Sequence, residues 1–221
     1  MKKFIAIFVA IVLVLAGLGY VAYLNSAMLL AEIISRKTMT PVSIQEIKWG
    51  KEGFIVEDLT IGNPKGTRLP TALRVQIIDV DAPYKQYFKD PIVIDKIHLD
   101  NVYVNIQIYD KDQAKGNWQT LMANMAVDHK SPLSIERSAL IKKLILTNIQ
   151  IDLILSDGKL HHLSPIERLE FDNISSDKGI PTQEISEIIV QKMMQSIFLQ
   201  KGLKTIIEAP VDVLKGVIPF L

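Results

Sequence analysis

The chain begins with a long stretch in which no charge interrupts the hydrophobic residues. Lys2 and Lys3 precede the run FIAIFVAIVLVLAGLGYVAYL at residues 4–24. A helix of this length, rising about 1.5 Å per residue, crosses the roughly 30 Å hydrocarbon core of a bilayer. Because the lysines stand before the run, the positive-inside bias puts the N-terminus in the cytoplasm and the remainder across the membrane. We therefore predict an uncleaved single-pass anchor.

A cleaved signal peptide is the alternative interpretation of this run. Signal peptides have apolar cores of about 7–15 residues, followed by a cleavage site of small residues. The core here is longer, and the best candidate site, NSA at residues 25–27, matches that pattern poorly. The pattern therefore favours the anchor.

The helical spacing continues beyond the apolar run and then stops. Apolar residues recur at a helical spacing, at Leu29, Leu30, Ile33 and Ile34. The sequence TMTP at residues 38–41 then interrupts the pattern. Residues 1–38 therefore form one predicted segment, an anchor helix with its extension.

From Val42 the hydrophobic period changes to two, and it stays so to about residue 174. This alternation predicts a β-sheet domain over residues 39–180. Three stretches inside it have their own patterns: NWQTLMANM at 117–125 predicts a short helix, VDHKSPLS at 127–134 a loop, and SDGKLHHLSP at 156–165 an exposed hairpin with its return strand.

The last segment, residues 181–221, returns to a helical pattern. Thr182 is a candidate N-cap, and the apolar positions after it share one stripe of an amphipathic helix. These positions are Ile185, Ile188, Ile189, Met193, Ile197 and Phe198. Such a helix either packs on the concave face or the end of the sheet, forms a lid, or lies on a membrane surface.

One eight-residue unit recurs four times in the β region. Its form is aliphatic, two variable residues, aliphatic, one variable residue, aliphatic or Phe, one variable residue, and Asn. The copies are VEDLTIGN at 56–63, IDKIHLDN at 94–101, IKKLILTN at 141–148 and IERLEFDN at 166–173. After the second and third Asn the apolar alternation resumes one residue out of phase.

Such a slip turns the side chains to the other face of the sheet unless the strand absorbs one residue. A β-bulge or a tight bend at each Asn absorbs it, because Asn tolerates the left-handed region and can bond its own backbone. In the first copy Asn63-Pro64 makes the corner more abruptly. We interpret the four asparagines as solvated turn residues without a ligand, at the corners of a curved antiparallel sheet.

Several of these stretches resemble the N-terminal region of the AsmA-like family of bacterial envelope proteins. They are GFIVEDLTIGNPKG at 53–66, IVIDKIHLDNVYVNIQI at 92–108 and KGNWQTLM at 115–122. The order of parts is also similar, from a membrane helix through a strand at PVSIQEIKWG, 41–50, to this block. The resemblance covers roughly residues 1–125, and family members are usually several times longer.

The resemblance implies a protein of the cell inner membrane that faces the periplasm. Its curved antiparallel sheet would form an open apolar groove for acyl chains, with a role in lipid transport or outer-membrane homeostasis. The implied partners are a phospholipid or other acyl-chain lipid, the inner membrane and a protein of the envelope. Strand phase assigns the groove-facing residues as Ile97, Leu99, Val102, Val104, Ile106, Ile108, Ile149, Ile151 and Leu153, whereas Tyr103, Asn105 and Gln107 would face away.

Composition and charge narrow the function classes. The chain has 221 residues and a formal net charge of +1, from 25 basic and 24 acidic residues, so no electrostatic footprint for nucleic acid is present. It has no cysteine, which excludes disulfides, thiol catalysis and a lipid-modified Cys.

The candidate catalytic chemistry is sparse. Of the four histidines, His161 and His162 are adjacent on a predicted strand and face opposite sides, which makes them a poor chelate. His98 would face solvent, and His129 lies in the predicted loop. The sequence has no G-x-S-x-G, S-x-x-K or phosphate-binding glycine motif. We interpret the chain as non-enzymatic, without a cofactor or a metal.

A second functional hypothesis shares the anchor and the corners. In it the chain is a membrane-tethered scaffold or interaction module, and its own C-terminal helix fills the sheet so that no lipid enters. The two hypotheses differ in whether the apolar face accepts a ligand.

Overall fold

The computed structural model describes residues 24–109, 116–126 and 139–175. Most of the predicted anchor, the predicted loop at 127–134 and the predicted C-terminal helix lie outside these ranges. Within them, no helix is long and apolar enough to cross a membrane.

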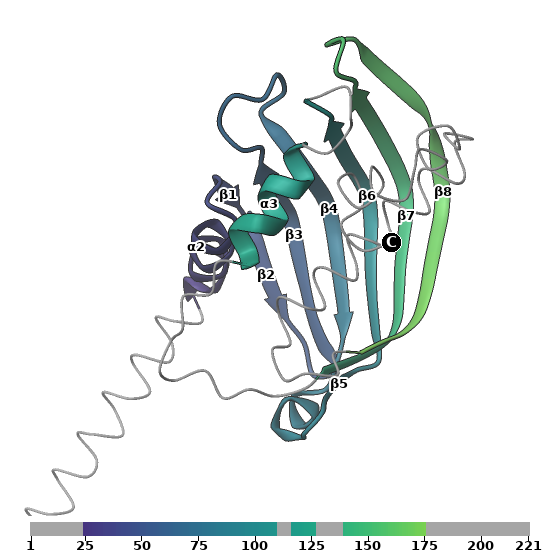
Figure 1. The fold of residues 1–221 in the computed structure, drawn as a ribbon. Helices are drawn as coiled ribbons and strands as arrows, with labels where there is room; N and C mark the ends of the chain where they lie inside the picture. The colour runs from purple at the N-terminus through teal and green to yellow at the C-terminus, as the bar shows by residue number, and fades with distance from the viewer. Residues whose placement is uncertain (1–23, 110–115, 127–138, 176–221) are drawn as a thin grey trace, which may run out of the picture.

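The described part is mainly β, as the alternation predicted (Figure 1). The predicted short helix is confirmed as α3. The described part of the predicted segment 1–38 is helical and ends at Thr38, where the TMTP sequence begins. The elements are α2 (Ser26–Thr38), β1 (Val42–Ser43), β2 (Glu46–Trp49), β3 (Gly53–Gly62), β4 (Thr71–Asp81), η1 (Tyr84–Phe88), β5 (Ile92–Ile94), β6 (Lys96–Gln107), α3 (Asn117–Ala126), β7 (Ala139–Ile154) and β8 (Leu160–Ser175).

The strands form one open, mixed sheet. Its order is β1-β3-β4-β6-β7-β5, with β2 also paired to β3 and β8 also paired to β7. The prediction of a purely antiparallel sheet is wrong, because β7 runs parallel to both β6 and β5. Parallel neighbours need a long crossover, usually with a helix, and the connection from β6 to β7 contains α3. In Figure 1 the long strands β7 and β8 curve along their length.

The predicted change of phase is present, and it falls on one row across the sheet. In β6 the inward residues are Ile97 and Leu99 before Asn101, and Val102 and Val104 after it. The same switch occurs in the neighbouring strands, at positions that the pairing register aligns. This face-switch row consists of Asp58 in β3, Gln76 in β4, Asn101 in β6, Asn148 in β7 and Glu167 in β8.

Left-handed backbone produces the switch in three of the five strands. Asn101 has φ 53°, Asn148 φ 54° and Asp58 φ 49°. The pairing register is the same on both sides of the row in the β3–β4 and β4–β6 ladders, so the strands bend without inserting an extra residue. The sequence allowed either a β-bulge or a tight bend at each Asn, and the structure has a tight bend at Asn101.

The first repeat copy departs from the prediction. Asn63 is buried and lies just after the end of β3, and the left-handed residue of this copy is Asp58. The sequence does contain a signal for a change of face near Asp58. Two residues separate the apolar Val56 and Leu59, whereas a regular strand would have one. Asn173, in the fourth copy, does have positive φ, at 52°.

Two apolar clusters line the face of the sheet that we call the inner face. The larger one joins β4, β6, β7 and β8 with Trp118 and Leu121 of α3. The smaller one packs Leu30 and Ile34 of α2 against β2 and β3. Asn124 Nδ2 of α3 donates to the Thr38 carbonyl at 2.7 Å, which ties the two helices together.

Candidate functional site

The structure brings all nine predicted groove residues into the larger apolar cluster. Seven of them are buried: Val102, Val104, Ile106, Ile108, Ile149, Ile151 and Leu153. Ile97 and Leu99, on the other side of the face-switch row, are partly buried and pack against the same cluster. Without the change of face at this row, the apolar residues on one side of it would point to the outer face. The row therefore keeps one apolar surface continuous along the strands.

This surface is covered in the structure. Val104 and Ile149 have no exposed surface, and the other five buried residues keep 5% or less. Part of the cover comes from α3, whose Trp118 and Leu121 belong to the cluster. The apolar layer is therefore enclosed at these seven residues and partly open at Ile97 and Leu99.

A buried cluster of four amide side chains lies beside the apolar layer, where β3 and β6 end and β4 begins. We call it the amide cluster; its members are Asn63, Asn105, Gln107 and Asn117. Asn63 Nδ2 donates to the Asn105 side chain at 3.0 Å and to the carbonyls of Leu69 and Thr71. Gln107 Nε2 donates to Asn105 Oδ1 at 2.6 Å.

Asn117, the first residue of α3, connects the cluster to the helix. Its Nδ2 donates to Asn63 Oδ1 at 2.7 Å and to the Asn105 carbonyl at 2.8 Å, and its Oδ1 accepts the backbone N–H of Gln107 at 2.8 Å. Trp118 Nε1 also donates to the Asn105 carbonyl. Because buried amides are stable only when bonded, this cluster fixes where α3 begins over the apolar face.

The sequence interpretation missed this cluster. Asn63 was expected to be a solvated turn residue, and Asn105 and Gln107 were expected on a face away from the core. The expectation for Asn63 is wrong, because its side chain is buried. Asn105 and Gln107 do alternate with the apolar residues, as expected, but they are buried as well, because the loop from Asn63 to Pro70 bonds over the end of β6: Arg68 N donates to Gln107 Oε1 at 2.9 Å. Period-two alternation predicts the side on which a residue lies, and it does not reveal that a distant loop covers that side.

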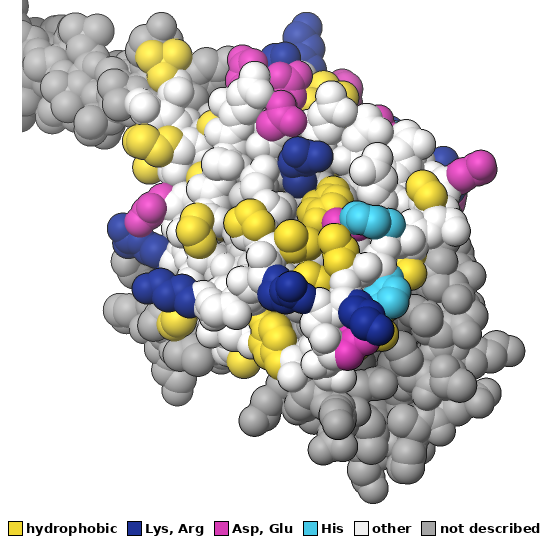
Figure 2. Space-filling view, turned by 90° about the horizontal axis from the view of Figure 1, so that it is seen from above, with side chains coloured by type: hydrophobic (Ala, Val, Ile, Leu, Met, Phe, Trp, Pro, Cys, Tyr) yellow, Lys and Arg dark blue, Asp and Glu magenta, His cyan; other side chains and the backbone are white. Residues whose placement is uncertain are grey.

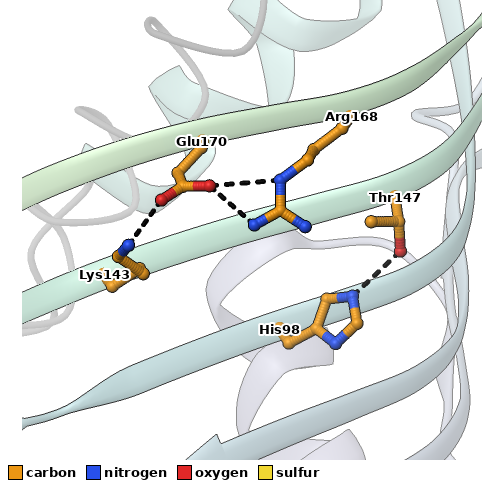
Figure 3. A network of polar contacts seen from close by, with 5 residues as sticks. All are labelled: His98, Lys143, Thr147, Arg168 and Glu170. Carbon is orange, nitrogen blue, oxygen red and sulfur yellow. Dashed lines mark hydrogen bonds and ion pairs between the residues drawn. The ribbon is translucent and has the colours of Figure 1, made fainter.

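The opposite, outer face carries the exposed charged and polar networks (Figure 3). Lys143 Nζ contacts Glu170 Oε1 at 2.5 Å, and Arg168 donates to Glu170 Oε2. The hydrogen bond from Lys143 keeps the pKa of Glu170 below its ordinary value. His98 was expected to face solvent. It lies on the outer face but is half-buried, and its ring forms a 2.9 Å hydrogen bond with Thr147 Oγ1.

A second outer network surrounds Asp100, next to the face-switch row. Thr147 Oγ1 donates to Asp100 Oδ1 at 2.6 Å, and Asn148 Nδ2 donates to the same oxygen at 2.8 Å. The hydrogen bond from Thr147 is the main reason why the pKa of Asp100 lies below its ordinary value. Asn101 and Asn148 themselves are exposed, as predicted.

Tyr103 and the hairpin histidines lie further along the same strands. Burial and a 2.9 Å hydrogen bond to Asp152 raise the pKa of Tyr103 to about 12, so the phenol stays neutral at physiological pH. His162 bonds the other Asp152 oxygen at 2.6 Å. The predicted hairpin is confirmed between β7 and β8, with His161 and His162 exposed on the return strand.

The end of the molecule that carries the β3–β4 loop is seen in Figure 2. A group of hydrophobic side chains lies near the middle of this view, with charged residues around it. Tyr109 and Leu160, which are 44% and 43% exposed, follow β6 and begin β8 at this end.

Comparisons with protein-family models, curated proteins and solved structures give no match for this chain.

Proposed function

We propose that this chain is a membrane-anchored, AsmA-like envelope protein whose inner sheet face binds lipid acyl chains. The observation that supports the proposal is the continuity of the apolar layer: residues of four strands on both sides of the face-switch row form one cluster. An acyl chain needs such an uninterrupted hydrocarbon surface, because any unpaired polar group along it would cost about 1–3 kcal/mol. The proposed role is lipid binding or transport, at the inner membrane and on its periplasmic side.

The second candidate is the tethered scaffold with a self-filled sheet. It is favoured by a different observation, the near-complete burial of Val104, Ile149 and Ile151. If the chain itself supplies all of that cover, no space remains for a ligand.

Photo-crosslinking separates the two candidates. The full chain is reconstituted with a phospholipid that carries a diazirine on one acyl chain, irradiated, and its adducts are mapped by mass spectrometry. Lipid binding predicts adducts on inner-face positions of β6 and β7, such as Val104 and Ile151. Adducts confined to residues 4–24 would favour the scaffold.

Two substitutions that introduce a charge give a second test of lipid binding against a sealed core. In Val104→Asp a carboxylate replaces a fully buried side chain, and burying it away from water would cost several kcal/mol. If the layer opens for lipid, the variant stays folded and loses its adducts, whereas in a sealed core it unfolds. Gln150→Asp, which changes an exposed residue between Ile149 and Ile151, is the matched control and should keep both fold and adducts.

A further inference from the structure

The end of the molecule opposite to that in Figure 2 exposes aromatic side chains to an unusual degree. It consists of the β2–β3 hairpin, residues 48–54, and the turn around η1, residues 84–89, and we call it the hairpin end. Phe88 is 82% exposed, Tyr84 65% and Trp49 50%. Large aromatic side chains this exposed are typical of surfaces that meet another apolar phase.

The two parts of the hairpin end are adjacent in space. Gly53 pairs with Asp81, and the Ala82 N–H donates to the Glu52 carbonyl at 2.9 Å, immediately before η1. In Figure 1, η1 projects beyond the strands at the lower edge of the sheet. Phe88 and Tyr84 therefore project from the same end of the sheet as Trp49.

The chain also enters the sheet domain at this end. Trp49 Nε1 donates to Ser26 Oγ at 3.4 Å, so the first turn of α2 contacts the hairpin. Just before it stands the uncharged sequence of residues 4–24, and the first described residues continue the apolar exposure: Leu24 is 61% exposed and Met28 63%. The segment of the chain that is best suited to a bilayer thus ends beside the exposed aromatics.

Charge at the hairpin end fits a phospholipid surface. Its basic residues are Lys48, Lys51, Lys85 and Lys89. Glu52 is the acid inside residues 48–54 and 84–89, and Asp81 and Asp90 lie at their borders. Lys48 is engaged by Glu57 at 2.5 Å, while Lys85 Nζ lies 6.0 Å from the centre of the Tyr84 ring. Aromatic rings at the headgroup level with lysines beside them are the usual composition of a membrane interface.

From these observations we infer that the hairpin end rests on the membrane surface, with Trp49, Tyr84 and Phe88 in the headgroup region of an anionic phospholipid bilayer. This inference deepens the proposed function, because it relies on the anchor. It orients the sheet so that β6 and β7 begin near the bilayer and extend away from it, with the amide cluster at the far end. The inner-face residues nearest to the bilayer are then those at the starts of β5, β6 and β7, among them Ile94, Ile97 and Ile141.

Site-directed spin labelling tests this orientation, and the absence of native cysteine makes it simple. Single-cysteine variants Phe88→Cys and Leu160→Cys of the full chain are labelled with a nitroxide and reconstituted in vesicles of phosphatidylcholine and phosphatidylglycerol. Collision with oxygen and with a water-soluble nickel chelate is then measured by electron paramagnetic resonance. Leu160, exposed at the opposite end, is the matched control.

The expected result is a severalfold higher ratio of oxygen to nickel accessibility for the label at Phe88 than for the label at Leu160. Equal, water-like ratios at both positions, with the protein still floating with the vesicles, would overturn the inference and leave the anchor intact. Loss of flotation would overturn the inference and the proposed membrane attachment together. Lipid adducts on β6 and β7 test the proposed acyl-chain site separately.

Discussion

Asn63 and Asn101 occupy the same position of the repeated unit and have opposite surroundings. Asn101 is exposed, has left-handed backbone and lies within β6, which continues past it. Asn63 is 7% exposed and follows the end of β3, and its backbone is not in the left-handed region. The backbone conformation accounts for the Asn at position 101, and the side-chain hydrogen bonds account for the Asn at position 63.

The same residue type at the same position of a repeat can therefore have two different physical roles. Where the strand goes on, the residue must let the backbone bend, which Asn does at little cost. Where the strand stops, the same side chain can fold back and bond carbonyls that the ended ladder leaves unpaired. The two roles respond differently to glycine, which supplies backbone freedom and no side chain.

The largest expected effect is at the buried residue. Asn63→Ala should lower the free energy of unfolding by about 2–4 kcal/mol, because it leaves Asn117 Nδ2 and the Thr71 carbonyl with fewer partners in a buried site. Asn63→Gly should destabilise at least as much. Chemical denaturation monitored by circular dichroism measures both.

Gln150→Ala removes an exposed amide from β7 and is the matched control, with an expected change within about 0.5 kcal/mol. If Asn63→Ala were as mild as this control, the amide cluster would not hold α3 in place.

The second effect, at Asn101, is smaller. Asn101→Val should cost about 1–2 kcal/mol, because a β-branched residue resists the φ of 53° that the face switch requires. Asn101→Gly should be close to neutral, in contrast to Asn63→Gly. Thermal unfolding of both variants checks this, and a valine variant as stable as the parent would show that the bend can move elsewhere.

Asp58 provides a third test, because it takes the left-handed role in the first repeat copy. Asp58→Val should cost about 1 kcal/mol, whereas Asp58→Asn, which preserves tolerance of a φ of 49°, should change stability by less than about 0.5 kcal/mol. A valine variant less stable than Asn101→Val would indicate that β3 depends on the face-switch row more than β6 does.

The smallest effect concerns pH. The pKa of Asp100 is lowered in the folded protein, so its contribution to stability is present above the ordinary carboxylate pKa of about 3.9 and is lost as pH falls through the folded-state value. Asp100→Asn should therefore flatten the loss of melting temperature between pH 6 and pH 3. Thr147→Val, which removes the main hydrogen bond to Asp100, should flatten it similarly.

The sequence predicted the local features of this fold and missed the distant ones. The β region, α3, the β7–β8 hairpin and the bends at Asn101 and Asn148 follow from short-range periodicity and from the conformational tolerance of Asn. The parallel pairing of β6 with β7 could not be predicted, because alternation along a strand has no information about the direction of its neighbour.

The candidate site divides in the same way. Strand phase placed all nine apolar residues on one surface, because burial follows the period of the strand once the slip is recognised. The amide cluster joins Asn63 to residues 42 and 54 positions further along the chain, and no local pattern predicts contacts of that range.

The face-switch row also determines which additions to the sheet would preserve its apolar layer. Because every strand from β3 to β8 on this row changes face at the same level, an extra strand with the same spacing would meet its neighbour with apolar residues already on the correct side. Such a strand would lengthen the apolar layer without a change in the existing strands. Insertion of a single residue into one strand, by contrast, needs a compensating irregularity, such as the register shift between Ile149 and Ile151 in the β7–β8 ladder. We therefore expect the sheet to tolerate an added strand more readily than a single-residue insertion at the row.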